Sequence, residues 1–584
     1  MTIEQDWPRV SQQKAGARAS WLRLDQTRVL VIALAIILGI LVAPPAIILL
    51  LRSLSITNPD ATVGGWTLTH YLRFFTNPDL YRTLVNSLTF ALFSTVVALL
   101  FGGTLAWLVE RTNTRFKALA YLTTVISMGT PYILYVSAWL FLLGRSGPFN
   151  DAWRTMTGTR QVLFNPYSLT GMILIEGFLW SPLVFLLLSS TFRSANADLE
   201  EAARMSGAGV LRTVWSVSIR MATPAIAALA LFVFIRAIEA FEVPALVGMP
   251  GNVDVLTTDV YRSIKESIPP DLGYASAYSV VLLVAVAILL HFYGKLSRNA
   301  GRYSTVTGKG YRPRQFDLGK WRPVGDALVI FNFLIVLVLP LLALLWLSLL
   351  PYMRPMRPSG VAQFSLANFA TVLSSEYYRT LAINTLIVGV VAASVGMILA
   401  LFTGWLSARR KAGAQFVDQL ATMPLVFPGI VMGVAFLMIF LSVPLPIYGT
   451  IWALAIAYTV RYLPYGLRYT YAGVLQISNE LEEAAGASGA TPLQSLRRVI
   501  APLLSPALLS GWLFIFLIAT KELAVAVLLS GPSSPVVAVG MYDLWVNGQG
   551  GELAAFGLIW AAVMTLVASV FYLAGGRAGG AGAH

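Results

Sequence analysis

The sequence predicts an all-α membrane protein with about twelve transmembrane helices, arranged as two parallel repeats of six helices. Of the 584 residues, 57% are hydrophobic and only 12% are charged, whereas soluble domains carry about 25% charged residues. Long apolar runs follow one another along the chain, and a helix needs roughly 20 such residues to cross a bilayer. A polar motif between two of these runs occurs twice, at a constant offset of 282 residues.

The apolar runs define twelve predicted membrane spans. In the first, 23 residues without a charge lie between Arg28 and Arg52. No small-residue cleavage site follows, so we expect a retained helix rather than a signal peptide. The predicted spans are 29–51, 84–109, 119–143, 168–190, 222–247, 274–293, 327–350, 381–407, 415–441, 447–469, 503–529 and 553–575.

Basic residues are distributed unevenly between the predicted loops. If the N-terminus is cytoplasmic, 26 of the 41 Lys and Arg residues fall in cytoplasmic segments, 11 in outer segments and four within spans. Lys and Arg gather on the cytoplasmic side of membrane proteins, so we expect both termini there. The net charge of +14 has the same explanation, and we expect the basic loops to contact membrane lipid rather than nucleic acid.

The repeats are expected to be joined by a basic cytoplasmic linker. In each repeat a span, an outer loop, a span that starts near an Asn and the polar motif follow in the same order. An even number of crossings makes the repeats parallel in the membrane. The predicted segments are a cytoplasmic N-terminal segment (1–28), a first repeat (29–293), the linker (294–326), a second repeat (327–575) and a C-terminal tail (576–584).

The duplicated polar motif covers 199–208 and 481–490, and eight of its ten positions match. Its acidic residues fall in the first turn of a predicted short helix, where the helix dipole favours them. Gly207 and Gly489 can end this helix in a left-handed conformation. An ordinary amphipathic loop would explain one copy. Two copies at corresponding places favour a surface element that a soluble partner binds.

The residue content argues against an enzyme. The chain has no cysteine and only three histidines, which excludes disulfides and thiolate metal sites. The phosphate-binding pattern Gly-x-x-x-x-Gly-Lys-Ser/Thr is missing as well. We therefore predict no catalytic residue, no metal site and no cofactor bound by this chain.

In both repeats the motif resembles the coupling loop of binding-protein-dependent ABC import permeases, which reads Glu-Ala-Ala, three residues, then Gly. The matching residues are Glu201, Ala202, Ala203 and Gly207 in the first repeat and Glu483, Ala484, Ala485 and Gly489 in the second. The resemblance implies that each loop docks on an ABC ATPase subunit, so the fused chain would bind two copies, which hold ATP and Mg. It also implies an extracytoplasmic solute-binding protein and a location in the bacterial cytoplasmic (inner) membrane. Arg220 stands where the family usually has proline.

Charged residues within the predicted spans are candidates for the translocation path, because charge within a membrane is costly and often functional. These candidates are Glu239, Glu242, Lys521 and Glu522. Arg236 and Glu239, three residues apart on a helix, could neutralise each other. Alternatively, Lys521 could pair with Glu239 across the repeats. Glu242 and Glu522 would then remain to line a path for a cationic solute.

The fused arrangement most resembles the ferric-iron branch of these permeases, as do the runs Phe-Glu-Val-Pro at 241–244 and Lys-Glu-Leu at 521–523. The resemblance implies ferric iron as cargo, a hard cation that prefers oxygen ligands. Thiamine, polyamine and phosphonate importers have similar permeases and remain alternatives. A carrier driven by an ion gradient, with Glu239, Glu242 and Lys521 as a proton relay, is favoured less because its duplicated docking loops would have no ATPase to bind.

Overall fold

A computed structural model describes residues 26–57, 63–194, 198–301, 315–352, 354, 356, 358–443 and 446–580. In this part of the chain nearly all regular structure is helical, as predicted. The strands found there form one antiparallel pair, β1 (Ser55–Thr57) and β2 (Val63–Trp66). Most of the predicted N-terminal segment and residues 302–314 of the predicted linker lie outside the described residues.

The first repeat contains twelve labelled helices in the described residues. They are α1 (Gln26–Ser53), α2 (Thr69–Thr76), α3 (Pro78–Arg111), α4 (Lys117–Gly129), α5 (Tyr132–Leu143), α6 (Pro148–Thr157), α7 (Leu169–Ser194), α8 (Asp198–Met205), α9 (Val210–Thr213), α10 (Ile219–Ile238), α11 (Leu256–Lys265) and α12 (Leu272–Gly301). A π-helical turn, Val214–Ser218, joins α9 to α10 without a break.

The second repeat follows the same order. Its helices are α13 (Arg322–Phe333), α14 (Leu339–Leu349), α15 (Ala367–Ser374), α16 (Glu376–Ala408), α17 (Ala414–Thr422), α18 (Gly429–Ser442), α19 (Ile451–Leu475), α20 (Glu480–Ala487), α21 (Pro492–Ser495), α22 (Ala501–Leu503), α23 (Ser505–Ala519), α24 (Ala526–Leu529), α25 (Val537–Val546) and α26 (Gly550–Gly580). A π-helical turn, Leu496–Ile500, again follows the short helix α21.

Eight helices of the described chain are long and apolar enough to cross a membrane, and three bent pairs raise the number to eleven. The remaining predicted span, 447–469, is helix α19. Its arginines and tyrosines lower its hydropathy, and it is not among the helices counted above. Helices α17 and α18 lie on either side of a bend of 108°, and α4 and α5 on either side of one of 112°. The bends follow from proline, because Pro131 and Pro428 keep the preceding residue extended.

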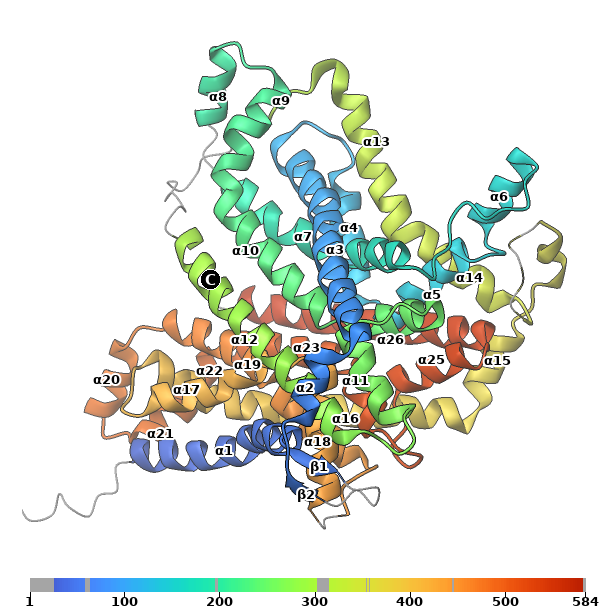
Figure 1. Cartoon of the computed structure of the whole chain (residues 1–584). Helices are drawn as coiled ribbons and strands as arrows, with labels where there is room; N and C mark the ends of the chain where they lie inside the picture. Colours follow the sequence, from blue (N-terminus) through green and yellow to red (C-terminus); the bar gives the residue numbers. More distant parts are fainter. Residues whose placement is uncertain are drawn as a thin grey trace, which may run out of the picture.

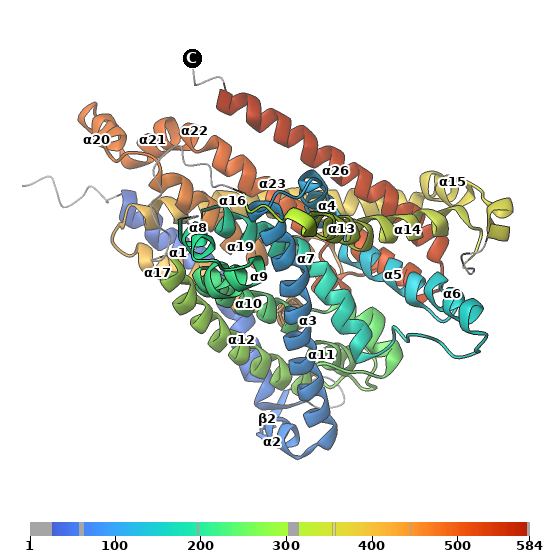
Figure 2. The same ribbon diagram turned by 90° about the horizontal axis from the view of Figure 1, so that it is seen from above.

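The repeats exchange their first spans. Helix α1 packs on α17 and α18 of the second repeat, and α13 and α14 pack on α4 and α5 of the first. Figure 1 and Figure 2 show both contacts, with the blue α1 beside the orange elements of the second repeat. One hydrophobic core contains buried residues of both repeats. The two repeats therefore form one folded unit.

Within each repeat, a long helix packs closely along the helix that precedes the polar motif, α3 on α7 and α16 on α19. A Cβ atom at Gly102 would lie 2.4 Å from the backbone oxygen of Ser181, and one at Gly404 would lie 2.9 Å from Cβ of Thr470. Glycine at these positions allows the helix backbones to approach. The pairs form corresponding scaffolds on which the two copies of the polar motif and the charged residues are placed.

Candidate functional site

The intramembrane charged residues gather where spans are interrupted. Helix α10 ends at Ile238 and α23 at Ala519, so the predicted spans 222–247 and 503–529 are not continuous helices. Glu239 is the residue after the first end, and Lys521 and Glu522 follow the second. Non-helical backbone at membrane depth needs internal hydrogen-bond partners. We call Arg236, Glu239, Glu242, Arg461, Lys521 and Glu522 the central cluster.

In the first repeat, Arg236 and Glu239 form an ion pair. Arg236 Nη1 lies 2.6 Å from Glu239 Oε2, and the Glu239 side chain is only 4% exposed. The predicted local neutralisation is therefore present, and the alternative pairing of Lys521 with Glu239 is not the arrangement found. Lys521 Nζ lies 4.7 Å from the ring centroid of Tyr132, at the start of α5. Its charge is attracted by the Glu242 carboxylate.

In the second repeat, Glu522 is bound on several sides. Arg461 Nε donates to Glu522 Oε2 at 3.2 Å, and the hydroxyl of Tyr462 donates to the same oxygen. Glu522 Oε1 accepts the backbone N–H of Val525 at 3.1 Å, and Tyr458 donates to the Glu522 backbone oxygen at 3.1 Å. In this conformation Glu522 holds the interrupted backbone together rather than presenting an open carboxylate to a solute.

Arg461 is a site residue that the sequence reasoning missed. It lies in α19 and also donates from Nη1 to the backbone oxygen of Phe427, at 3.4 Å, where α17 and α18 bend apart. Gly429 leaves room for it, because a Cβ atom there would lie 2.9 Å from Arg461 Nη2. An arginine inside a predicted span was the available signal, since intramembrane charge is rare and usually placed for a reason.

The central cluster joins the two repeats. The first repeat supplies Arg236, Glu239 and Glu242, and the second supplies Arg461, Lys521 and Glu522. The charges of Arg461 and Glu522 act on both glutamates of the first repeat. The three residues of the first repeat carry a formal net charge of −1 and those of the second a formal net charge of +1. The repeats therefore attract each other at the central cluster. Any path between the repeats at this level must part these groups.

The duplicated motif forms short helices that project from the body of the molecule. In Figure 1, α8 lies at the top and α20 at the left edge. Gly207 and Gly489 follow these helices with φ of +82° and +85°, which confirms the predicted left-handed stops. We call residues 198–209 and 480–491 the first and second docking loops.

Each docking loop is anchored by a matching ion pair that the sequence analysis did not identify. In the first repeat, Glu200 is 6% exposed and its Oε2 lies 2.5 Å from Arg111 Nη2, while Ser218 donates to Oε1 at 2.6 Å. In the second, Arg409 Nε lies 2.7 Å from Glu482 Oε1. Arg111 and Arg409 also donate to backbone oxygens, those of Phe192 and Ile477.

These anchors turn Glu200 and Glu482 toward their arginines. Glu201 is half-buried, whereas Ala202, Glu483 and Ala484 are exposed, as are Gly207 and Gly489; Ala203 and Ala485 are half-buried. The repeated sequences Trp107 to Arg111 and Trp405 to Arg409 were a signal for the anchors, because tryptophan and arginine recur with the same spacing. Both loops thus present their alanine and glycine surface to solvent on a fixed base.

Comparison with known proteins gives the same picture. The family model described as binding-protein-dependent transport system inner membrane component matches residues 98–301 and 392–578, once in each repeat. The chain is 27% identical over 500 residues to the ferric transport system permease protein FbpB of Actinobacillus pleuropneumoniae, covering 84% of this chain and 70% of that protein.

Two further relatives show the range of similar proteins. The putative ferric transport system permease protein FbpB 1 of Haemophilus influenzae is 28% identical over 448 residues, covering 75% of this chain and 69% of that protein. A putative 2-aminoethylphosphonate transport system permease protein, PhnV, of Salmonella paratyphi A is 25% identical over 254 residues, covering 42% of this chain and 94% of that protein. The family model matches most of the chain, and the chain therefore belongs to the binding-protein-dependent transport system inner membrane components.

Proposed function

We propose that this importer permease carries ferric iron across a bacterial inner membrane, using ATP hydrolysed by a separate subunit. The observation that carries the proposal is the pair of docking loops, each anchored by the same Arg–Glu pair at the corresponding place in two fused repeats. Similarity to two ferric transport permeases over most of the chain supports the cargo. The shorter match to a 2-aminoethylphosphonate permease makes that solute the second candidate.

The partners follow from the two loops. Each loop would dock on one copy of an ABC ATPase, and ATP and Mg would be bound there rather than by this chain. A solute-binding protein would deliver the cargo on the opposite side of the membrane. The loops and both chain termini would then be cytoplasmic, in agreement with the excess of basic residues in the same predicted segments.

The route from a docking loop to the central cluster is short and helical. In the first repeat, α9, the turn Val214–Ser218 and α10 form one continuous helical rod that ends beside Glu239. In the second, α23 continues from α22 after a bend of 75° and ends just before Lys521. When the ATPases close on ATP, movement of the loops would be transmitted along these helices and would part Lys521 from Tyr132 and Glu242.

The cargo assignment is tested by uptake of labelled ferric iron in cells with and without this chain. We expect deletion to abolish high-affinity uptake, and we expect excess thiamine, polyamine or 2-aminoethylphosphonate not to compete. Competition by the phosphonate would shift the cargo to that solute. Uptake that survives ATP depletion but stops with an uncoupler would instead favour a carrier driven by an ion gradient.

The docking assignment is tested by reversing the charge of the motif glutamate that follows each anchoring glutamate, Glu201→Lys together with Glu483→Lys. Repulsion in the ATPase cleft should abolish uptake and release the ATPase during purification. The matched control is Glu376→Lys, which changes an exposed glutamate of α16 outside both docking loops. Normal uptake by the double variant would refute the assignment.

A further inference from the structure

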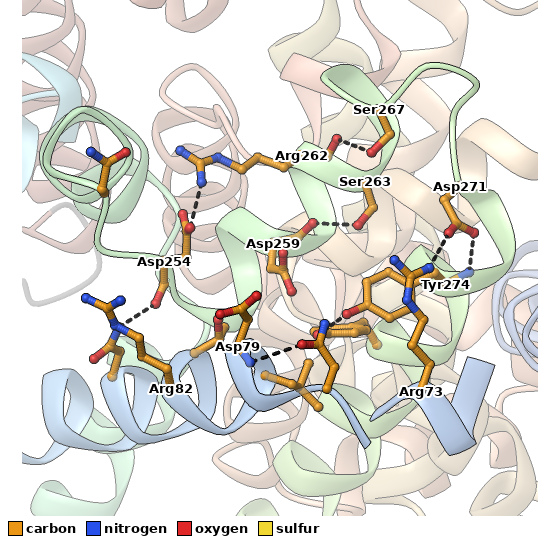
Figure 3. A pocket seen from close by; sticks show the side chains of 16 residues that line it. Arg73, Asp79, Arg82, Asp254, Asp259, Arg262, Ser263, Ser267, Asp271 and Tyr274 are labelled. Atoms are coloured by element: carbon orange, nitrogen blue, oxygen red, sulfur yellow. Dashed lines mark hydrogen bonds and ion pairs between the residues drawn. The ribbon is translucent and has the colours of Figure 1, made fainter. Parts of the chain in front are cut away.

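A polar cavity of about 350 Å³ lies in the first repeat, at the opposite end of α3 from Arg111. Its wall is built by the start of α3, residues 252–255, α11 and the start of α12 (Figure 3). The charged side chains that line it are Arg73, Asp79, Arg82, Asp254, Asp259, Arg262 and Asp271. Seven charged side chains of both signs therefore line one cavity.

Two ion pairs connect parts of the cavity wall. Arg262 Nη1 lies 2.6 Å from Asp254 Oδ2, and Arg73 Nη1 lies 3.1 Å from Asp271 Oδ2. The Arg73 guanidinium also lies 4.6 Å from the ring centroid of Tyr274, which is buried. Burial raises the pKa of the Asp254 carboxyl, and the charges of Arg262 and Arg82 partly offset this effect. Arg262 and Arg73 therefore each have a carboxylate partner in the cavity.

Two charged residues of α3, Asp79 and Arg82, form the rim of the cavity. Arg82 and Asp79 are exposed and lie three residues apart on α3, so they project from one face of the helix. Within the described residues, neither side chain forms an ion pair. A free ion would be attracted by one of these two charges and repelled by the other. A surface that carries both signs would satisfy the two together, which favours a macromolecular partner.

The second repeat has the same backbone arrangement without this set of charges. Asn86 Nδ2 donates to the backbone oxygen of Asp254 at 3.1 Å, and Asn384 Nδ2 donates to that of Pro535 at 3.0 Å. Leu256 N donates to Ser87 Oγ and Val537 N to Thr385 Oγ1, at 2.9 and 2.8 Å. These bonds fix the correspondence of the two segments.

By that correspondence, Asp254 matches Pro535 and Asp259 matches Gly540. A Cβ atom at Gly540 would lie 2.4 Å from Leu381 Cδ1, so apolar packing fills this place in the second repeat. The two repeats therefore present unlike surfaces at this end of the molecule, although their scaffolds match.

We propose that the cavity is an electrostatic socket for the solute-binding protein, which is held by ion pairs on the first repeat and not on the second. This inference rests on the proposed function. The contacting edge of the partner carries a carboxylate for Arg82 and a cationic side chain for Asp79. One-sided pairing fixes the orientation in which the binding protein sits across two similar repeats, since a partner turned by half a revolution meets Arg379 and Glu376, which already pair with each other at 3.2 Å.

The test uses the full-length chain with its ATPase in nanodiscs and the purified, Fe³⁺-loaded solute-binding protein of the same transport system. The Kd of docking is measured at low and high NaCl for wild type, for Arg82→Glu and for the swapped variant Arg82→Asp with Asp79→Arg. The swap keeps the net charge and inverts its pattern. The matched control is Arg379→Glu, because Arg379 follows the corresponding tyrosine in the second repeat and pairs with Glu376 within α16 at 3.2 Å.

We expect both socket variants to weaken docking roughly tenfold at low salt, since rim charges control electrostatic association. For the same reason, docking of both variants should depend much less on salt than docking of wild type does. Arg379→Glu should stay within about twofold of wild type on the same argument, and basal ATP hydrolysis should be unchanged in all variants. Equal Kd values for the two repeats' variants would overturn the socket. So would a change in binding of a probe ion, Tb³⁺ or phosphate, without any change in docking. Failure of wild type to bind the Fe³⁺-loaded protein would instead refute the proposed cargo.

Discussion

At the scale of single residues, the buried Arg111–Glu200 pair decides whether the first docking loop has a fixed base. The Arg111 side chain is 1% exposed and that of Glu200 is 8% exposed, so removal of one partner leaves an uncompensated charge in a dry place. Breaking such a pair typically costs about 3–5 kcal/mol, whereas replacing both partners costs much less. Each partner is stable in this buried site only when the other is present, and the pair thereby fixes the position of the loop.

We predict that Arg111→Met lowers the thermal unfolding midpoint of the purified chain and weakens retention of the ATPase. Arg111→Met combined with Glu200→Gln should recover much of the midpoint, because no buried charge remains unpaired. Arg409→Met, alone and with Glu482→Gln, repeats the comparison in the second docking loop. A double variant no better than the single variant would show that the ion pair is not what holds the loop.

The same argument applies to Arg461 and Glu522 in the central cluster. Arg461→Met would leave Glu522, which is 9% exposed, with its hydroxyl and backbone partners only, so we expect loss of uptake and lower stability. Arg461→Met with Glu522→Gln should restore assembly with the ATPase but not full transport, if the charges serve the path. Uptake is measured against copurified ATPase, which separates a transport defect from a folding defect. Full uptake by the double variant would show that these charges have only a structural role.

At the scale of helices, the interruptions within the spans place the charged residues. The bend between α17 and α18 brings Gly429 against Arg461, and a Cβ atom there would also lie 2.8 Å from Cβ of Ala524. We predict that Gly429→Ala displaces Arg461 and reduces ferric uptake several-fold, while the ATPase still copurifies. Gly396→Ala is the control, because its Cβ would meet nothing closer than Ile515 Cδ1 at 3.9 Å. Equal uptake by both variants would argue against a role for this close approach.

The helices also show which features of the structure could be predicted from the sequence. Apolar length predicted the spans, and glycine predicted the ends of α8 and α20, because both depend on local chemistry. The end of α23 was not predictable from length, since the Glu522 side chain and Tyr458 on α19 satisfy the interrupted backbone. The sequence also could not show that Glu200, rather than Glu201, is the glutamate that pairs with a buried arginine. A short surface helix has no apolar period to reveal which adjacent residue turns inward, and the partner arginine lies in a distant helix.

At the scale of the whole molecule, the exchanged first spans bind the repeats together. Helix α1 of the first repeat packs on α17 and α18, and α13 and α14 of the second pack on α4 and α5. Hydrogen bonds also connect the two repeats where the chain enters the second repeat. Phe316 N donates to the backbone oxygen of Arg111 at 2.6 Å, and Asn113 Nδ2 donates to Asp317 Oδ1 at 2.7 Å.

We therefore predict that the covalent connection is dispensable for assembly. Fragments 1–301 and 315–584, expressed together, should copurify and support ferric uptake, because they keep the contacts between the repeats that α1, α13, α14 and Asn113 make. Removing residues 1–53 from the first fragment should abolish copurification, since α1 packs on the second repeat. Fragments that fail to associate when each is stably inserted in the membrane would show instead that the linker is needed to hold the repeats together.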